Sequence, residues 1–114
     1  MNTLRGIDPK MIANNLESSI LIHPGEMIKD EIVSRGMTQK KLAEMTGIAP
    51  SVLNEVLNGK RSVTTEYALL IEAALGIDAD IWIGLQADYD KQKARHDTSF
   101  LKRLEEIRKY AALL

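Results

Sequence analysis

The sequence predicts an all-α protein, namely a five-helix domain of the helix-turn-helix type followed by an additional C-terminal helix. Leu, Ile, Ala and Met dominate an apolar content of 45%, whereas aromatic residues make up only 4%, which favours helix-on-helix packing over a β-sandwich. Residues 38–61 have the pattern of two short helices around a tight turn. Residues 99–114 repeat apolar side chains at helical intervals.

A chain of 114 residues accommodates one domain, or one domain with appendages. We expect an N-terminal extension over residues 1–22, a helix-turn-helix DNA-binding domain over 23–97 and a C-terminal helix over 98–114. Cysteine is absent, which excludes disulfides and thiolate zinc sites. No apolar run approaches the ~20 residues that span a bilayer, and no signal-peptide pattern is present. The expectation is a soluble cytoplasmic protein without a membrane partner.

The N-terminal extension leaves two interpretations open. Asp8-Pro9 favours the start of a short helix that carries Leu16, whereas Asn14-Asn15 disfavours one. The apolar run over residues 20–22 also fits an extended segment that packs on the core or on a partner.

The motif His23-Pro24-Gly25-Glu26 opens the first strong helix, which ends at Gly36. Pro24 lies near the helix N-terminus, where its missing N–H costs nothing, and Glu26 complements the helix dipole there. The inner face is predicted to consist of Met27, Ile28, Ile32 and Val33.

The two central helices are defined by their ends. Thr38 is a good N-cap, and Gly47 can take the left-handed conformation that ends a helix. Pro50 suits the first position of the next helix. That second helix places three apolar residues on one face at positions i, i+3 and i+4, namely Leu53, Val56 and Leu57.

The opposite face of this second helix is polar and free to enter a DNA major groove. Ser51 and Glu55 point outward, Val52 and Asn54 lie on the flanks, and Asn58-Gly59 closes the helix. The formal net charge of −1 argues mildly against a nucleic-acid binder. A few cations concentrated at one edge still permit DNA binding, and the candidates are Lys40, Lys41, Lys60 and Arg61.

The fourth helix is expected to begin at the N-cap Thr64 and to end at Gly76. Its core positions are predicted to be Ala68, Ile71 and Leu75. It also bears Leu69, Leu70 and Ala73, so it is apolar nearly all round. Such a helix is buried on more than one side, either at a subunit or partner interface or under the C-terminal segment.

Asp78 is expected to cap the fifth helix, on which Trp82 is predicted to anchor the core, and a break is expected near Asp97-Thr98. The C-terminal helix has apolar steps of 4, 3, 4 and 3. This seam consists of Phe100, Leu104, Ile107, Ala111 and Leu114. Two heptads are too few for a stable helix alone, so we expect it to dock on its own domain or on a second copy.

Catalytic and metal chemistry are not expected. His23 and Glu26 are three residues apart, but a metal site needs three or four ligands, and the other histidine, His96, lies in a charged run. The sequence has no cysteine nucleophile, glycine-rich phosphate loop or carboxylate–histidine cluster. We therefore predict no metal, no cofactor and no enzyme activity.

From His23 to Asp90 the sequence resembles the HigA-type antitoxins of the XRE group of helix-turn-helix proteins, which have a lambda-repressor-like fold. The HPGE motif, the stretches TQKKLAEMTGI and LNEVLNGKRSV, and the run WIGLQADYD carry the resemblance. The resemblance implies a dimer that binds a palindromic operator in double-stranded DNA, represses its own operon and neutralises a RelE-like mRNA-cleaving toxin.

The resemblance also implies which residues contact DNA. Gln39, next to the N-cap Thr38, matches a glutamine that touches backbone or base, and the loop after the recognition helix usually holds phosphate. The implied DNA-binding residues are Thr38, Gln39, Pro50, Ser51, Val52, Asn54, Glu55, Asn58, Lys60 and Arg61. Two positions depart from the family pattern. Ala49 replaces a capping Ser or Thr, and Glu55, which could accept from a cytosine amino group, would also repel phosphates.

Two other functions fit the same residues. One is a stand-alone XRE-type repressor without a toxin, which the identity of the neighbouring gene would distinguish. The other is a protein-interaction module that has lost DNA binding, as the net charge and Glu55 suggest. A steep loss of DNA affinity with added salt would exclude that module.

Overall fold

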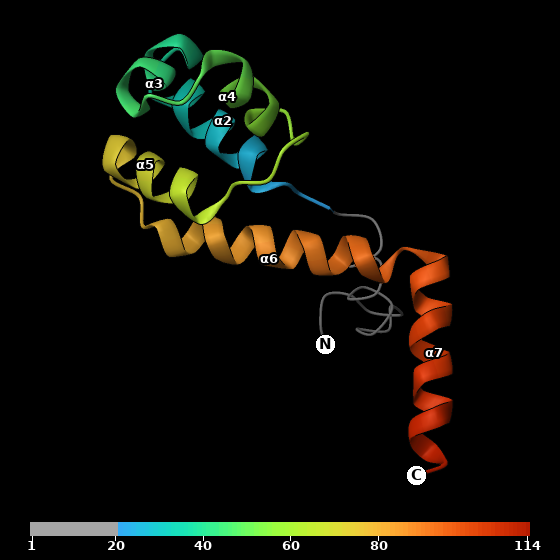
Figure 1. The fold of residues 1–114 in the computed structure, drawn as a ribbon. Coiled ribbons are helices and arrows are strands. Elements are labelled where there is room, and N and C mark those ends of the chain that lie inside the picture. Colours follow the sequence, from blue (N-terminus) through green and yellow to red (C-terminus); the bar gives the residue numbers. More distant parts are fainter. Residues whose placement is uncertain (1–20) are drawn as a thin grey trace, which may run out of the picture. The chain divides into compact units, whose positions relative to one another are not determined.

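The computed structural model describes residues 21–114, which form helices and no strand within that range (Figure 1). The helices are α2 (Pro24–Ser34), α3 (Gln39–Thr46), α4 (Pro50–Leu57), α5 (Thr65–Leu75), α6 (Ala79–Arg95) and α7 (Thr98–Ala112). The predicted all-α class is confirmed, and residues 21–97 contain five helices before the additional C-terminal one. The short helix and the start of the extended run considered for residues 8–20 lie outside the described residues.

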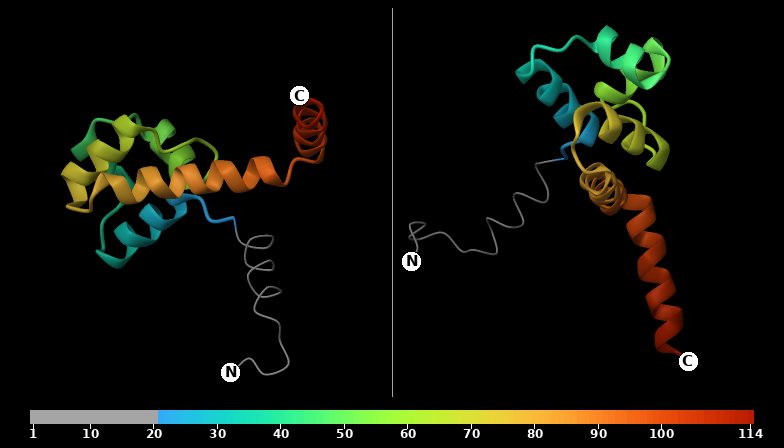
Figure 2. Two further views of the ribbon diagram at one scale, coloured as in Figure 1. Left: turned by 90° about the horizontal axis from the view of Figure 1, so that it is seen from below. Right: turned by 90° about the vertical axis from the view of Figure 1, so that its left-hand side faces the viewer.

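Residues 22–89 form one compact unit, which contains α2 to α5 and the first part of α6. Residues 90–114 belong to a second unit, and α6 continues without a break past that boundary (Figure 2). The core of the first unit contains side chains from each of its helices. Its fully buried members include Ile28, Leu42, Leu53, Leu57 and Ile71. Their removal from water is the main stabilising contribution, about 1.5–3 kcal/mol for each large side chain.

The helix ends follow the capping residues in the sequence. The Thr38 hydroxyl accepts a hydrogen bond from the Lys41 N–H at 3.0 Å, and Gly47 ends α3 at a φ of 76°. Thr64 caps α5 in the same way as Thr38 caps α3. Asp97 caps α7 by accepting from the N–H groups of Phe100 and Ser99. The bond from the Phe100 N–H, followed by that from the Ser99 hydroxyl, holds the pKa of its carboxyl below the ordinary value.

The inner face of α2 is narrower than predicted. Ile28 and Ile32 are buried, but Met27 and Val33 are 39% and 68% exposed. Residues 28 and 32 are one helical turn apart and share a line along the helix, whereas Met27 and Val33 lie about 100° to either side of that line. The prediction that Met27 and Val33 face the core was therefore wrong.

Three predicted core residues of α5 are buried, whereas two of its other apolar side chains are not. Leu69 and Leu70 are 51% and 39% exposed, as an interface with a partner requires. The seam of α7 is also exposed, since Phe100 and Ile107 are 41% and 55% accessible and none of the side chains in this helix is buried.

Helix α4 lacks a side-chain cap, as its sequence predicts. Ala49 stands at the N-cap position, is exposed and makes no capping bond. We expect Ala49→Ser to raise the free energy of unfolding by about 0.5–1 kcal/mol, because a serine oxygen can accept from an N–H in the first turn. Urea denaturation measures the change. Thr38→Ala, which removes a formed cap, should lower stability by about 1 kcal/mol. A destabilising Ala49→Ser would mean that the new hydroxyl does not reach the first-turn N–H groups.

Candidate nucleic-acid interface

The outward face of α4 is the centre of the candidate site. Leu53, Val56 and Leu57 are 0% exposed and hold the opposite side of the helix in the core. This packing fixes the direction in which the polar side chains project. All ten residues implied by the sequence to bind DNA are exposed or partly exposed. Six lie in α4 or at the residue directly after it. Two are the N-cap and the first residue of α3, and two lie in the loop after α4.

A polar chain crosses the C-terminal end of α4 and brings in a cation from another helix. The Asn58 side-chain amide donates to Asn54 Oδ1 at 3.2 Å, and Lys29 Nζ donates to Asn58 Oδ1 at 3.1 Å. Lys29 belongs to α2 and lies 29 residues before Asn58 in the sequence. Sequence reasoning missed Lys29 because no local pattern links positions so far apart.

Glu55 and Arg61 form an ion pair on the same face. Arg61 Nη2 and Nε donate to Glu55 Oε1 at 2.7 and 3.0 Å, and both side chains are about half exposed. The hydrogen bond from Arg61 to Glu55 and their opposite charges raise the pKa of Arg61 above its ordinary value. The negative charge of Glu55, which would repel DNA phosphates, is thus balanced by Arg61 in the following loop.

A tight turn after α4 brings these two residues together. The Lys60 N–H donates to the Glu55 carbonyl at 2.8 Å, and the Gly59 N–H donates to the Val56 carbonyl at 3.1 Å. These two bonds, with Gly59 at a φ of 75°, form a Schellman motif. The chain reverses there and returns Arg61 toward the helix it has just left.

The N-terminal end of α4 is open to an external acceptor. Ala49 offers no capping oxygen, and Pro50 has no N–H. The N–H groups of the next residues therefore point outward with the positive end of the helix dipole, an arrangement that suits phosphate. At the start of α3, by contrast, the Thr38 hydroxyl is already engaged by the Lys41 N–H, and Gln39 beside it is partly exposed.

The HPGE motif sets the position of α2 against α4. His23 is 3% exposed and caps α2, with Nδ1 accepting from the Gly25 N–H at 2.9 Å. Its ring meets that of Tyr89 edge to face, with centroids 4.9 Å apart. Gly25 allows α2 to pass directly beside the Val56 carbonyl, where a Cβ would collide with that oxygen. The motif therefore packs α2 closely against α4.

Gln86 ties the loop after Arg61 to α6. This side chain is 7% exposed, and its Oε1 accepts from the Val63 N–H at 2.8 Å. Trp82, Gln86 and Tyr89 lie on one side of α6 at helical spacing, which explains the pattern of the WIGLQADYD run. Sequence reasoning used Gln86 as part of a motif but did not find its role in holding the loop.

We expect Gln86→Ala to lower the free energy of unfolding by about 1–3 kcal/mol, because the buried Val63 N–H loses its acceptor. Gln86→Glu keeps an oxygen acceptor but places a carboxylate at this buried position, so it should also lower stability. Gln92→Ala, on the following part of α6, serves as a control. Thermal unfolding followed by circular dichroism measures all three, and equal stability of Gln86→Ala and the control would contradict the assignment.

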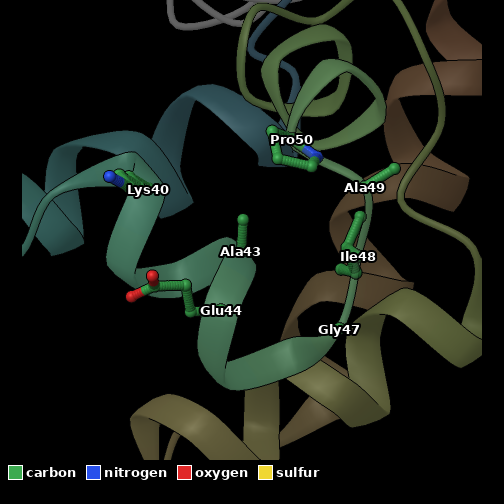
Figure 3. A pocket seen from close by; sticks show the side chains of 7 residues that line it. All are labelled: Lys40, Ala43, Glu44, Gly47, Ile48, Ala49 and Pro50. Atoms are coloured by element: carbon green, nitrogen blue, oxygen red, sulfur yellow. The ribbon is translucent and has the colours of Figure 1, made fainter.

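A shallow hollow of about 400 Å³ lies between α3 and the start of α4 (Figure 3). Its lining consists of Lys40, Ala43, Glu44, Gly47, Ile48, Ala49 and Pro50. Only one ammonium and one carboxylate border it, which is a poor set for orienting a small ligand.

Neither a metal site nor a membrane span emerges from residues 21–114. No group of three or more His, Cys, Asp or Glu side chains in this range is arranged to hold an ion. Among the same residues, no helix has the length and apolar character to cross a bilayer.

Comparison with known proteins identifies the family. Residues 28–82 match the helix-turn-helix family model. Virulence-associated protein I of Dichelobacter nodosus is 34% identical over 77 residues, which cover 67% of this chain and 71% of the relative. Antitoxin HigA-1 of Vibrio cholerae is 31% identical over 85 residues, which cover 70% of this chain and 80% of the relative.

A solved structure agrees with these relatives. The addiction module antidote protein of the HigA family from Coxiella burnetii superposes with a TM-score of 0.66 at 31% identity, covering 75% of this chain and 92% of that one. The residues matched by the family model include α4, the core that supports it and Trp82 of the α6 motif. The chain therefore belongs to the HigA family of helix-turn-helix antitoxins.

Proposed function

We propose that the protein is an antitoxin that binds its own operator through α4 and represses its own operon. The observation that carries this proposal is the exposed polar face of α4, held in place by three fully buried residues. Cations border it from two directions, Lys29 from α2 and Lys60 with Arg61 from the loop. This arrangement suits a helix in a major groove with phosphates on both sides.

The proposed contacts divide into positioning and reading. The open N–H groups at the start of α4, around Pro50 and Ser51, receive one phosphate, and Gln39 contacts backbone or base. The loop residues Asn58, Lys60 and Arg61 hold another. Ser51, Val52, Asn54 and Glu55 face the base edges. Phosphate contacts set the register, whereas base contacts supply the sequence preference.

We further propose a two-fold dimer on a palindromic site, with α4 of each copy entering successive major grooves about 34–36 Å apart. The exposed Leu69 and Leu70 of α5 support an additional protein interface.

We propose that a RelE-like mRNA-cleaving toxin binds a different surface, and the exposed apolar seam of α7 is the candidate for that surface. Co-expression with the adjacent reading frame tests whether the protein binds such a toxin. A protein that binds its operator but retains no neighbouring product would instead be a stand-alone repressor.

A gel shift on DNA from upstream of the gene tests the DNA contacts. The triple variant Gln39→Ala, Ser51→Ala, Lys60→Ala should lose about 100-fold or more in affinity, since each lost contact costs roughly 1 kcal/mol or more. Affinity of the unaltered protein should fall steeply with added salt. Lys91→Ala, which removes one exposed cation from α6, is the control for lost charge. Tight binding by the triple variant would contradict the assigned roles.

A further inference from the structure

We propose that Arg61 is a positioning residue for Glu55, and that the pair makes this protein select cytosine at one position of each operator half-site. The inference rests on the proposed operator binding and adds which base is chosen and how. It starts from the ion pair at the C-terminal end of α4, where two donors of one guanidinium meet one carboxylate oxygen.

The geometry leaves one acceptor for DNA. Both Arg61 bonds end on Glu55 Oε1. Among the described residues no donor reaches Oε2, and the Glu55 side chain is 47% exposed. The fork of a guanidinium restricts the orientation of the carboxylate more than a single ammonium would. Oε1 of this half-exposed carboxylate is thus held by Arg61, and Oε2 is left for a donor on DNA.

A carboxylate oxygen distinguishes the four bases because it only accepts hydrogen bonds. In the major groove cytosine offers the N4 amino donor, which Oε2 can accept. Guanine offers the acceptors N7 and O6, and thymine offers O4 and a methyl group, so both repel or fail to bind the carboxylate. Adenine has an amino donor but also an N7 acceptor beside it. The expected order at this position is cytosine, then adenine, with guanine and thymine last.

Arg61 makes this selection possible near phosphates. A lone glutamate on a recognition helix would be repelled by the DNA backbone and would occupy several rotamers. The paired guanidinium balances the charge and restricts those rotamers. The Schellman turn through Gly59 keeps Arg61 in reach, because the loop returns toward Glu55 immediately after α4.

The test is selection of bound sequences from the protein's own upstream DNA with each position randomised in turn. The unaltered full chain should prefer cytosine over guanine and thymine at one position per half-site by about 5- to 30-fold. Glu55→Gln should move this preference to adenine, whose N6 and N7 suit a glutamine amide. Glu55→Ala should abolish the preference at that position alone.

Arg61→Ala tests whether Arg61 positions Glu55 in addition to holding a phosphate. We expect it to reduce the cytosine preference at the same position as Glu55→Ala does. Lys60→Ala, the neighbouring cation, should weaken all sequences equally and keep the preference. Circular dichroism verifies that each variant is folded, which is expected because the pair is half exposed.

The outcomes separate this inference from the proposed function. Equal weakening of all sequences by Arg61→Ala, with the cytosine preference retained, would overturn the positioning role. Retention of the preference by Glu55→Ala would overturn the reading role while operator binding stands. Failure of the unaltered protein to select any DNA would overturn the proposed function itself, and this inference with it.

Discussion

Replacing Gly25 with alanine is expected to destabilise the protein by about 3–4 kcal/mol, among the largest effects of any single methyl group added to this fold. A Cβ at this position would lie 1.8 Å from the Val56 carbonyl oxygen and 2.8 Å from its carbon. Both atoms belong to backbone in the last turn of α4, so no flexible side chain can move aside. Either α2 shifts away from α4 or the end of α4 distorts.

The collision would also disturb the proposed DNA-binding surface, because the Val56 carbonyl accepts from the Gly59 N–H in the turn that returns Arg61 to Glu55. Urea denaturation measures the free energy of unfolding, and thermal unfolding should show a drop in Tm of roughly 12–32 °C, at about 4–8 °C per kcal/mol. Operator binding by any folded fraction should be weaker than that of the unaltered protein.

Gly84→Ala is the matched control. Gly84 lies inside α6, is exposed, and has no atom within 4 Å of its would-be Cβ. Alanine should stabilise that helix by about 0.5–1 kcal/mol, since glycine loses more backbone freedom on folding. Opposite signs at Gly25 and Gly84 would identify the α2–α4 contact as the cause. Little change in Gly25→Ala would mean that the two helices can separate at low cost.

Trp82→Ala is expected to cost about 3–5 kcal/mol, because this side chain is 4% exposed within the core and its removal leaves a large cavity. Trp82→Phe should cost much less, about 1 kcal/mol or below. The indole Nε1 is buried, and the part of the chain that the structure describes supplies no acceptor for it. Phenylalanine removes that unsatisfied donor, which offsets part of the lost packing.

Unfolding should be followed by far-UV circular dichroism, since Trp82 is the single tryptophan and its fluorescence is lost in both variants. A Trp82→Phe variant as unstable as Trp82→Ala would show that the indole N–H contributes a hydrogen bond in solution. Ile81, its exposed neighbour on α6, provides the control. Ile81→Ala should change stability by less than about 1 kcal/mol.

The core positions and helix ends were predictable because their signals are local. Thr38 and Gly47 mark the two ends of α3 through bonds to residues three and four positions away. The buried face of α4 follows from the spacing of Leu53, Val56 and Leu57 alone. The same reasoning failed for Met27 and Val33, because hydrophobicity does not reveal how wide a stripe the neighbouring helices cover.

The functional surface was predictable only in part. Periodicity identifies Ser51 and Glu55 as outward-facing, but whether they bind DNA stays a prediction. The sequence does not reveal which charged side chains lie beside them. From the sequence alone, Glu55 is expected to repel phosphate. Its pairing with Arg61 depends on the turn between the two residues, and the sequence does not reveal that pairing. The cation Lys29 was not anticipated at all.

Local patterns in the sequence predict the all-α class, the order of the five helices, the caps Thr38 and Thr64, and the helix-turn-helix at residues 38–61. These depend on interactions within about one helical turn, which the order of residues specifies directly. Which distant groups meet depends instead on tertiary packing. Lys29 reaches Asn58 across 29 residues, Gln86 reaches Val63 across 23, and Gly25 admits the Val56 carbonyl. Packing of the core brings these residues together in space, and no local sequence pattern predicts which residues become partners.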